Sequence, residues 1–276
     1  MKHLLSILGI LLISTLNAQE LSVMTYNIKL DYPKEGENSW TKRQPFMVDQ
    51  IKFYEPDVLG VQEAMPNQMN DLDKLLSDYK YVGVGRDDGK NEGEFSAIFY
   101  KKEDYKIIKQ STFWLSETPE KVSMGWDAVC NRVCTYALFK NKNTKQKFWV
   151  FNTHFDHVGK KARKNSAKLI IQKIKELNSK NLPVVLMGDF NLEANSESIQ
   201  YILNYLHDSK SLATNTLGPT GTFNGFKFHE PVTRRIDYIF LSPEIKVNKY
   251  AVLSDSKDCK YPSDHLPVLA LFEIFN

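Results

Sequence analysis

The sequence predicts a single α/β domain in which sheets and helices pack together as a sandwich. Short apolar runs typical of strands alternate with helical patterns along the whole chain, and no linker, repeat or low-complexity tract interrupts them. The composition, with 42% apolar and 25% charged residues, supplies an ample core and excludes collagen, coiled coil and disorder of the whole chain. A length of 276 residues allows two domains, but single α/β domains of this size are common.

The N-terminus is predicted to be a secretory leader rather than part of the fold. A short basic start, Met1 to His3, precedes a 13-residue apolar run over residues 4–16. This run is too short to span a bilayer, which needs about 20 residues. We expect residues 1–18 to be a signal peptide cleaved after Ala18, and residues 19–276 to form an exported domain, periplasmic or secreted, without stable membrane insertion. The alternative is an uncleaved membrane anchor.

Strands and helices are expected in alternation. Ten apolar runs predict strands over Leu21–Ile28, Asp57–Gln62, Phe95–Tyr100, Lys106–Phe113, Cys134–Phe139, Phe148–Thr153, Val184–Asp189, Ile236–Leu241, Lys246–Val252 and Pro267–Ile274. Helices are predicted over Arg43–Tyr54, Asn67–Ser77, Lys160–Asn178 and Glu197–Leu206. The third is the best supported, because Ala167, Ile170, Ile171, Ile174 and Leu177 recur at helical spacing. Long loops remain at 31–42, 114–131 and 207–235, and such loops are often functional.

Charge and cysteine content give no support to a general nucleic-acid binder or to a disulfide-rich or zinc-stabilised fold. The formal net charge is +3, and one unit less once Lys2 leaves with the leader, so the bulk charge makes no case for nucleic-acid binding. Three cysteines do not make a disulfide scaffold, and their spacing does not suggest structural zinc. If Cys130 and Cys134 share a strand they lie about 13 Å apart, too far to pair with each other. Pairing of either with Cys259, or no disulfide at all, stays open.

Polar side chains gather at the ends of the apolar strands. They are Asn27, Gln62-Glu63, Asn152 to His157, Asp189 to Asn191, Asp237 and Ser263-Asp264-His265. Sites in α/β folds gather at one end of the strands. Buried carboxylates are costly unless they are paired or bind a metal, so several in one place require a cation.

These segments together resemble the endonuclease/exonuclease/phosphatase superfamily, which has the DNase I-like fold. The matching pieces, in the order of the family, are Thr25-Tyr26-Asn27-Ile28, Val61-Gln62-Glu63, Asn152-Thr153-His154, Gly188-Asp189-Phe190-Asn191, Arg235-Ile236-Asp237-Tyr238 and Ser263-Asp264-His265-Leu266-Pro267-Val268. The resemblance covers nearly all of Leu21 to Phe275. It implies a four-layer sandwich of two mixed β-sheets flanked by helices, and Mg²⁺-dependent (or Mn²⁺-dependent) hydrolysis of phosphoester bonds by attack of water.

The resemblance implies a metal site at Glu63, Asn27 and Asp264. Glu63 is similar to the main metal carboxylate of the family, Asn27 to its usual neighbour, and Asp264 would place the metal or its waters. One carboxylate with an amide oxygen suits a hard cation such as Mg²⁺. Alternatively, Glu63 is a surface carboxylate at a strand end and Asn27 caps a turn.

The resemblance implies that residues at the end of the predicted strand Val184–Asp189 act on the attacking water and on the phosphate. Asp189 and Asn191 lie two residues apart, so on extended chain both point to one face. Asp189 would orient or deprotonate water, and Asn191 would donate to the phosphoryl oxygens as charge builds. The alternative is an Asx-turn after a buried strand.

Two histidines match catalytic histidines of the family. Asp237 would fix the tautomer of His265 and favour its charged form, so that the imidazole can contact the phosphate. His154 would donate to the transition state, or else is a packed core histidine. Ser263 is rejected as a hydrolase nucleophile, because adjacent residues on extended chain point to opposite sides.

Four further residues are candidates for phosphate or substrate contacts. Tyr100 and Arg132 sit where the family often places phosphate-contacting groups, although both suit ordinary strands. Helical geometry places Arg163 within an apolar stripe just after a strand end, and places Arg43 on the buried side of its helix. Either arginine could reach a phosphate or an active-site carboxylate, or merely cover apolar surface with its stem.

One departure from the family bears on the substrate. Some nucleases of the superfamily carry an acidic metal ligand two residues after the first-strand Asn, where this chain has Lys29. This puts a second metal contact in doubt and disfavours the apurinic-site repair type.

We therefore expect a monomeric phosphohydrolase that cleaves a phosphodiester or a phosphomonoester by in-line attack of water, in a phosphorylated small molecule, glycan or lipid head group. The alternatives are an exported nuclease for DNA or RNA, disfavoured by the near-neutral charge, and a binding module without turnover, disfavoured by the intact set of site residues.

Overall fold

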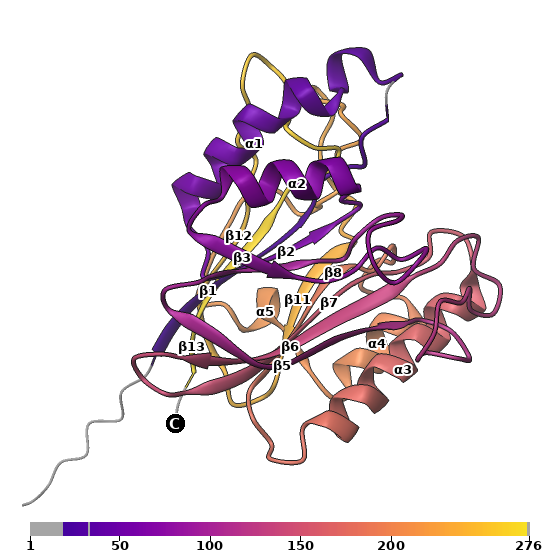
Figure 1. Cartoon of the computed structure of the whole chain (residues 1–276). Helices are drawn as coiled ribbons and strands as arrows, with labels where there is room; N and C mark the ends of the chain where they lie inside the picture. The colour runs from indigo at the N-terminus through magenta and orange to yellow at the C-terminus, as the bar shows by residue number, and fades with distance from the viewer. Residues whose placement is uncertain (1–18, 33, 275–276) are drawn as a thin grey trace, which may run out of the picture.

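Two mixed β-sheets pack face to face in the computed structural model, which describes residues 19–32 and 34–274 (Figure 1). The predicted leader lies outside the described residues. The first sheet has the order β10 (Asn215–Leu217), β12 (Lys246–Val252), β13 (Val268–Ile274), β1 (Gln19–Asn27), β2 (Val58–Gln62), β4 (Ile98–Lys101) and β3 (Tyr79–Val82). The second has the order β5 (Tyr105–Trp114), β6 (Val133–Asn141), β7 (Lys147–His154), β8 (Val184–Asp189), β11 (Asp237–Leu241) and β9 (His207–Asp208).

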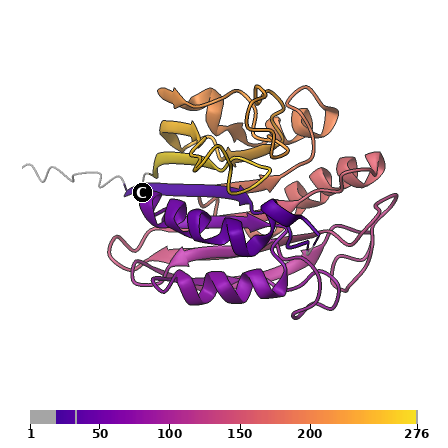
Figure 2. The ribbon, with the colours of Figure 1, turned by 90° about the horizontal axis from the view of Figure 1, so that it is seen from above.

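Helices cover the outer face of each sheet. The first sheet carries α1 (Trp40–Tyr54) and α2 (Pro66–Leu75), which lie over it in Figure 2. The second carries α3 (Lys160–Leu177) and α4 (Glu197–Leu203). Two short elements complete the list, the 3₁₀ turn η1 (Gly36–Asn38) and α5 (Ser209–Leu212). The architecture is the four-layer α/β sandwich that the resemblance implies.

The alternation of side chains along the strands explains the layers. Val23 and Val58 point into the core between the sheets, where they meet Val150, Met187 and Ile239 of the second sheet. Their neighbours point outward to the helices, since successive residues of a strand face opposite sides. Met24 and Leu59 pack against Met47 and Ile51 of α1, and Phe151 and Leu186 pack against Ile170 and Ile174 of α3. Each sheet is therefore apolar on both faces, as a central layer requires.

All ten predicted strands and all four predicted helices form, with small shifts of their ends. The first helix begins three residues early, at Trp40, whose indole Nε1 donates to Asp71 of α2 at 2.8 Å. The strand predicted from Phe95 begins at Ile98. The elements that the sequence analysis missed are η1, β3, β9, β10 and α5. They are short, and β3, β9 and β10 are edge strands, so their sequences carry little hydrophobic periodicity.

The three cysteines are free. Cys130 precedes β6, which begins at Val133, so Cys130 and Cys134 do not share a strand. Within the described ranges, no helix has both the length and the apolarity that crossing a bilayer requires.

Candidate active site

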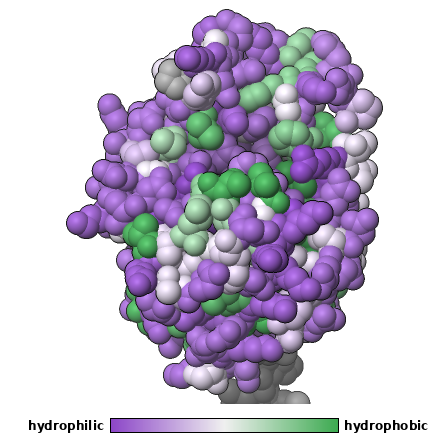
Figure 3. Space-filling view, turned by 90° about the vertical axis from the view of Figure 1, so that its right-hand side faces the viewer, coloured by the Kyte–Doolittle hydropathy of each residue, from purple (hydrophilic) through white to green (hydrophobic). Residues whose placement is uncertain are grey.

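The site lies at the end of the sandwich where four strands finish. β1 and β2 run parallel in the first sheet and end at Asn27 and Gln62, and β7 and β8 run parallel in the second and end at His154 and Asp189. Antiparallel β11 begins at the same rim, so that Asp237 stands opposite Asp189. Figure 3 views this end of the molecule, which is largely hydrophilic with an apolar band across its middle.

The amide of Asn27 joins two carboxylates across the two sheets. Its Nδ2 donates to Glu63 Oε1 at 3.0 Å and to Asp189 Oδ2 at 2.9 Å, while its Oδ1 accepts from the Lys29 amide. Glu63 follows β2 with a left-handed φ of 61°, and its Oε2 accepts from the Leu30 amide at 3.1 Å. Burial opposes its charge, but Lys29 and the Asn27 amide outweigh burial and lower the pKa of Glu63.

His265 and Asp237 form a buried pair. His265 Nδ1 lies 2.9 Å from Asp237 Oδ2, and His265 Nε2 lies 3.7 Å from Asp189 Oδ2. Burial opposes the charge of the imidazole, yet the carboxylates of Asp237 and Asp189 raise the pKa of His265 to about 10. Burial and the neighbouring Asp237 raise the pKa of Asp189 to about 7. The ring is therefore held as an imidazolium that faces Asp189 through Nε2.

His154 lies on the other side of Asp189. Its Nε2 is 3.4 Å from Asp189 Oδ2 and 3.0 Å from Asn191 Nδ2, which also donates to the Phe155 carbonyl. Burial, together with nearby Arg132 and Arg86, lowers the pKa of His154 well below its usual range. A neutral ring that accepts from Asn191 at Nε2 carries its proton on Nδ1, which faces Glu94 Oε2 at 3.9 Å.

The sequence analysis missed Glu94 and the arginine that fixes it. Arg86 and Glu94 form a two-point ion pair, in which Nη1 contacts Oε2 and Nη2 contacts Oε1, each at 2.7 Å. Both residues lie in a loop rich in charge between β3 and β4, where no apolar run marks one acid as different from its neighbours. Only the fold, which brings this loop beside β7, identifies Glu94.

Asp264 and Lys29 complete the wall next to Glu63. Lys29 Nζ lies 3.8 Å from Asp264 Oδ2 and 3.9 Å from Glu63 Oε2. Ser263 Oγ donates to the Asn27 carbonyl at 2.7 Å, so this serine fixes backbone and is no nucleophile. Burial, with a contribution from Glu63, raises the pKa of Asp264.

The donors gathered here fit a hard divalent cation. The carboxylate of Glu63 accepts from the Asn27 amide, and the carboxylates of Glu63 and Asp264 both lie beside Lys29 Nζ. Ligand atoms of Glu63, His154 and Asp189 lie within 4.8 Å of one another. Oxygen ligands of this kind are those that Mg²⁺ prefers. In the structure, Asn27 Nδ2 faces the carboxylates of Glu63 and Asp189. Asn27 Oδ1 can therefore bind a metal here only if the side-chain amide rotates.

Arg132 borders the site beside His154. It is 5% exposed, its Nη2 contacts His157 Nδ1 at 3.0 Å, and its Nε lies 3.5 Å from Asp156 Oδ2. Its buried Nη1 has no hydrogen-bond partner among the described residues. Half-buried Arg163 donates to the Asp156 carbonyl at 3.0 Å rather than to an active-site carboxylate.

Two predicted site residues lie elsewhere. Tyr100 is wrong as a catalytic residue: β4 runs antiparallel to β2, so Tyr100 stands opposite Val58, at the end of the sheet remote from Glu63, and packs on Phe139. Arg43 is wrong as a substrate contact, because its guanidinium is buried and is engaged by backbone carbonyls.

Asn191 reaches the site by a different backbone from the one predicted. Its φ is 50°, and its amide donates to Asp189 Oδ1 at 2.8 Å, so the chain turns here instead of staying extended. The Asx-turn that was the alternative interpretation is therefore present and is part of the site, because it brings the side-chain amide of Asn191 to His154.

A divalent-metal phosphoric ester hydrolase is the class that this four-layer fold and its rim of acids and histidines define. The chain matches the Endonuclease/Exonuclease/phosphatase family over residues 24–265 and belongs to it. The mannosyl-6-phosphatase of Bacteroides thetaiotaomicron superposes with a TM-score of 0.88 at 40% identity, covering 91% of this chain and 99% of that one. Another family member from the same organism gives a TM-score of 0.90 at 38% identity, with 93% and 98% covered. An uncharacterised protein of Acanthamoeba polyphaga mimivirus is 29% identical over 255 residues, 85% of this chain and 92% of that protein.

Proposed function

We propose that this chain is an exported, Mg²⁺-dependent phosphomonoesterase that acts on a sugar phosphate. The observation that carries the proposal is the positive charge around the acids: Lys29 beside Glu63, the imidazolium of His265, and the unpartnered Nη1 of Arg132. A phosphomonoester carries up to two negative charges at neutral pH, one more than a diester, and gains more from such surroundings. The 40% identity with a mannosyl-6-phosphatase supports the same class of substrate.

The position of each site residue indicates a different role in the proposed reaction. Glu63, Asp264 and the Asn27 oxygen would hold the metal, which when bound neutralises phosphate charge and acidifies water. Asp189 Oδ2, which accepts from Asn27 and lies beside the rings of His154 and His265, is placed to orient the attacking water and take its proton. Asn191, His154 and His265 surround it as groups that can donate to the phosphoryl oxygens, and Asp237 holds the ring of His265.

The near-neutral charge of the whole chain, +3, supports a small substrate over a nucleic acid. Export rests on the sequence of residues 1–18. It is tested by expressing the full chain in a bacterial host, fractionating the cells, and reading the N-terminal sequence of the recovered protein.

The test of the activity is a substrate panel with the mature protein. Mannose 6-phosphate, p-nitrophenyl phosphate, bis-p-nitrophenyl phosphate, plasmid DNA and RNA are each incubated with Mg²⁺ or Mn²⁺, with and without EDTA. We expect metal-dependent release of phosphate from the monoesters. Asp189→Asn and His265→Ala should lower kcat by about 10²–10⁴-fold with the fold retained. Preferential cleavage of the diester or of nucleic acid would contradict the monoester assignment.

A further inference from the structure

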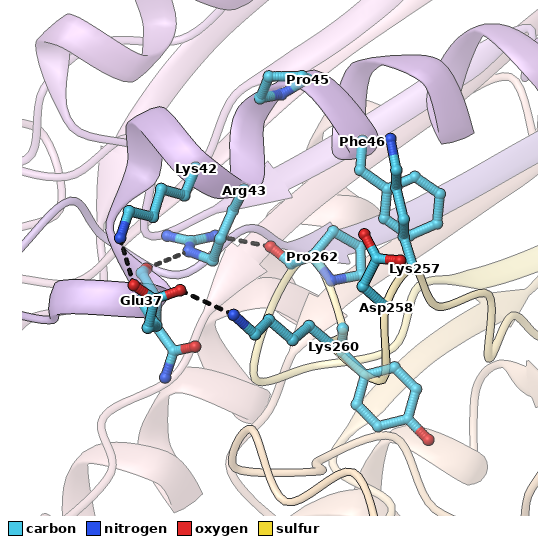
Figure 4. A pocket seen from close by; sticks show the side chains of 11 residues that line it. Glu37, Lys42, Arg43, Pro45, Phe46, Lys257, Asp258, Lys260 and Pro262 are labelled. Atoms are coloured by element: carbon cyan, nitrogen blue, oxygen red, sulfur yellow. Dashed lines mark hydrogen bonds and ion pairs between the residues drawn. The ribbon is translucent and has the colours of Figure 1, made fainter.

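Arg43, in the first turns of α1, uses four of its five N–H groups on main-chain carbonyls. Nη1 donates to Ile28 O and to Pro262 O, both at 2.8 Å, Nη2 donates to Lys29 O at 3.0 Å, and Nε donates to Asn38 O at 2.6 Å. Figure 4 shows the side chain reaching toward Pro262. The residue is 4% exposed.

Three of the four carbonyls that Arg43 binds belong to two segments of the site. Ile28 and Lys29 directly follow Asn27, and Pro262 directly precedes Ser263 and Asp264. A second tie between the same segments is the hydrogen bond from Ser263 Oγ to Asn27 O, which joins residues 236 positions apart. Arg43 thus spans the gap between the strand that carries Asn27 and the turn that carries Asp264.

The guanidinium is surrounded by aromatic rings and main-chain carbonyls. Its carbon lies 5.6 Å from the ring centre of Trp40 and 5.7 Å from that of Phe226. In the described part of the chain, no carboxylate lies within ion-pair distance of it. A buried arginine whose acceptors are all carbonyls acts on the backbone that it binds.

That backbone in turn holds Glu63. Lys29 has a left-handed φ of 57°, and the next amide, that of Leu30, donates to Glu63 Oε2. Fixing the carbonyls of Ile28 and Lys29 therefore fixes the direction of the Leu30 N–H. The same side chain sets the start of the turn that presents Asp264.

We propose that Arg43 is a positioning residue that fixes the distance between the Asn27–Glu63 half of the active site and the Asp264–His265 half. This inference rests on the proposed metal-dependent hydrolysis. Its tests include two measurements, Mn²⁺ binding and amide exchange, that do not require turnover.

A surface pocket beside Arg43 makes chemical rescue feasible. The pocket, of about 360 Å³, is lined by Arg43 together with Glu37, Lys42, Phe46 and Lys260 (Figure 4). Truncation of Arg43 would extend this pocket inward to the four carbonyls. Guanidinium ion has the shape and donors of the lost group, so it can enter and restore the contacts.

The experiment compares Arg43→Ala and Arg43→Lys with Lys42→Ala, a control in which the neighbouring exposed lysine, which contacts Glu37, is removed. Arg43→Ala should lower kcat by about 10²-fold, as expected for displaced catalytic groups. It should weaken Mn²⁺ binding, followed by electron paramagnetic resonance without substrate, by about 10-fold. Lys42→Ala should change neither quantity by more than about twofold.

Two readouts separate positioning from a mere loss of stability. Millimolar guanidinium should restore Mn²⁺ affinity and kcat in Arg43→Ala, and Arg43→Lys, with three donors, should fall between wild type and Arg43→Ala. Hydrogen exchange of the Leu30 amide should be faster in Arg43→Ala, whereas exchange within β8 should be unchanged.

The inference is overturned if folded Arg43→Ala binds Mn²⁺ as wild type does, or if guanidinium restores neither quantity. If Arg43→Ala does not fold, an Arg43→Lys variant with wild-type Mn²⁺ affinity and wild-type exchange at Leu30 overturns it. If the wild type hydrolyses no phosphomonoester, the proposed function fails, while Mn²⁺ binding and exchange still decide the role of Arg43.

Discussion

Gln62 of β2 and Asn152 of β7 join the two sheets directly beneath the active site. Gln62 Nε2 donates to Asn152 Oδ1 at 2.7 Å, and Asn152 Nδ2 donates to the carbonyls of Val61 and Ala97. Both side chains are fully buried. This polar contact adds a directional link between the two sheets to the apolar contacts around it.

Asn152→Ala should therefore destabilise the fold. It removes one acceptor of the buried Gln62 amide, which keeps Thr25 Oγ1 and the Gly60 carbonyl, and it removes the side-chain donor to two buried carbonyls, at a cost of about 1–3 kcal/mol in the free energy of unfolding. Urea unfolding measures this cost. Asn143→Ala, in the exposed turn after β6, is the control and should stay within about 0.5 kcal/mol of wild type. A change as small as the control's in Asn152→Ala would show that the bridge is dispensable.

Gly188→Ala adds only one methyl group, but it should lower both the thermal stability and the activity strongly. Gly188 has a φ of +145°, and a Cβ there would lie 2.0 Å from the Thr153 carbonyl oxygen. Since the obstacle is the backbone of the neighbouring strand, β8 must shift, and Asp189 with it. Gly36→Ala, with a φ of +53° but open space around it, isolates the cost of the dihedral angle alone, about 1–2 kcal/mol. We expect Gly188→Ala to lose more than that in thermal unfolding and to lose most activity.

Asp237→Asn tests the pair with His265. The imidazolium loses the carboxylate 2.9 Å away that stabilises its charge. We expect kcat to fall by about 10²–10⁴-fold, with little change in circular dichroism. Activity above half of wild type would remove Asp237 from the proposed mechanism.

The contribution of Asp156 to the free energy of unfolding should depend on pH. Burial opposes its charge, but the amides of Gly159, Val158 and Val129 more than compensate and lower its pKa. A carboxyl with a lowered folded pKa contributes stability above its unfolded pKa of about 3.9, and loses that contribution as pH falls through the folded pKa. Asp156→Asn should thus be destabilised by about 1–3 kcal/mol at pH 7. The gap from wild type, measured by urea unfolding, should be constant down to about pH 5 and should shrink below about pH 4. A gap that widens on acidification would contradict this assignment.

Metal binding should stabilise the wild type and not a ligand variant. A ligand that binds only the folded state adds about 2.7 kcal/mol at 100 times its dissociation constant. Mg²⁺ or Mn²⁺ should raise the thermal midpoint of the EDTA-treated wild type. Glu63→Gln should show a much smaller rise, because it loses the carboxylate proposed as the main ligand. Equal shifts in both proteins would place the ion elsewhere.

The sequence was sufficient for the layers and for most of the rim. The apolar runs that end in Asn27, Gln62, His154 and Asp189 are long and periodic, so both the strands and the polar residues at their ends could be predicted.

The sequence did not reveal features that depend on the direction of a strand or on contacts between distant segments. Tyr100 was misplaced because only the antiparallel pairing of β4 with β2 shows that it points away from the site. For Arg43, helical phase gave the buried side correctly, but not that carbonyls of two distant segments would occupy it. Glu94 was missed since its partner Arg86 and its neighbour His154 are brought together only by tertiary structure.

The central place of β13 has a consequence during synthesis on the ribosome. β13 pairs with β1 from Thr25↔Val268 to Gln19↔Ile274, so the opening strand lacks one of its two neighbours until the closing strand has been translated. The emerging polypeptide carries an incomplete sheet for most of its translation, when unpaired strand edges favour aggregation. If export occurs, a chain held extended for translocation would escape that hazard and complete the sheet only after crossing.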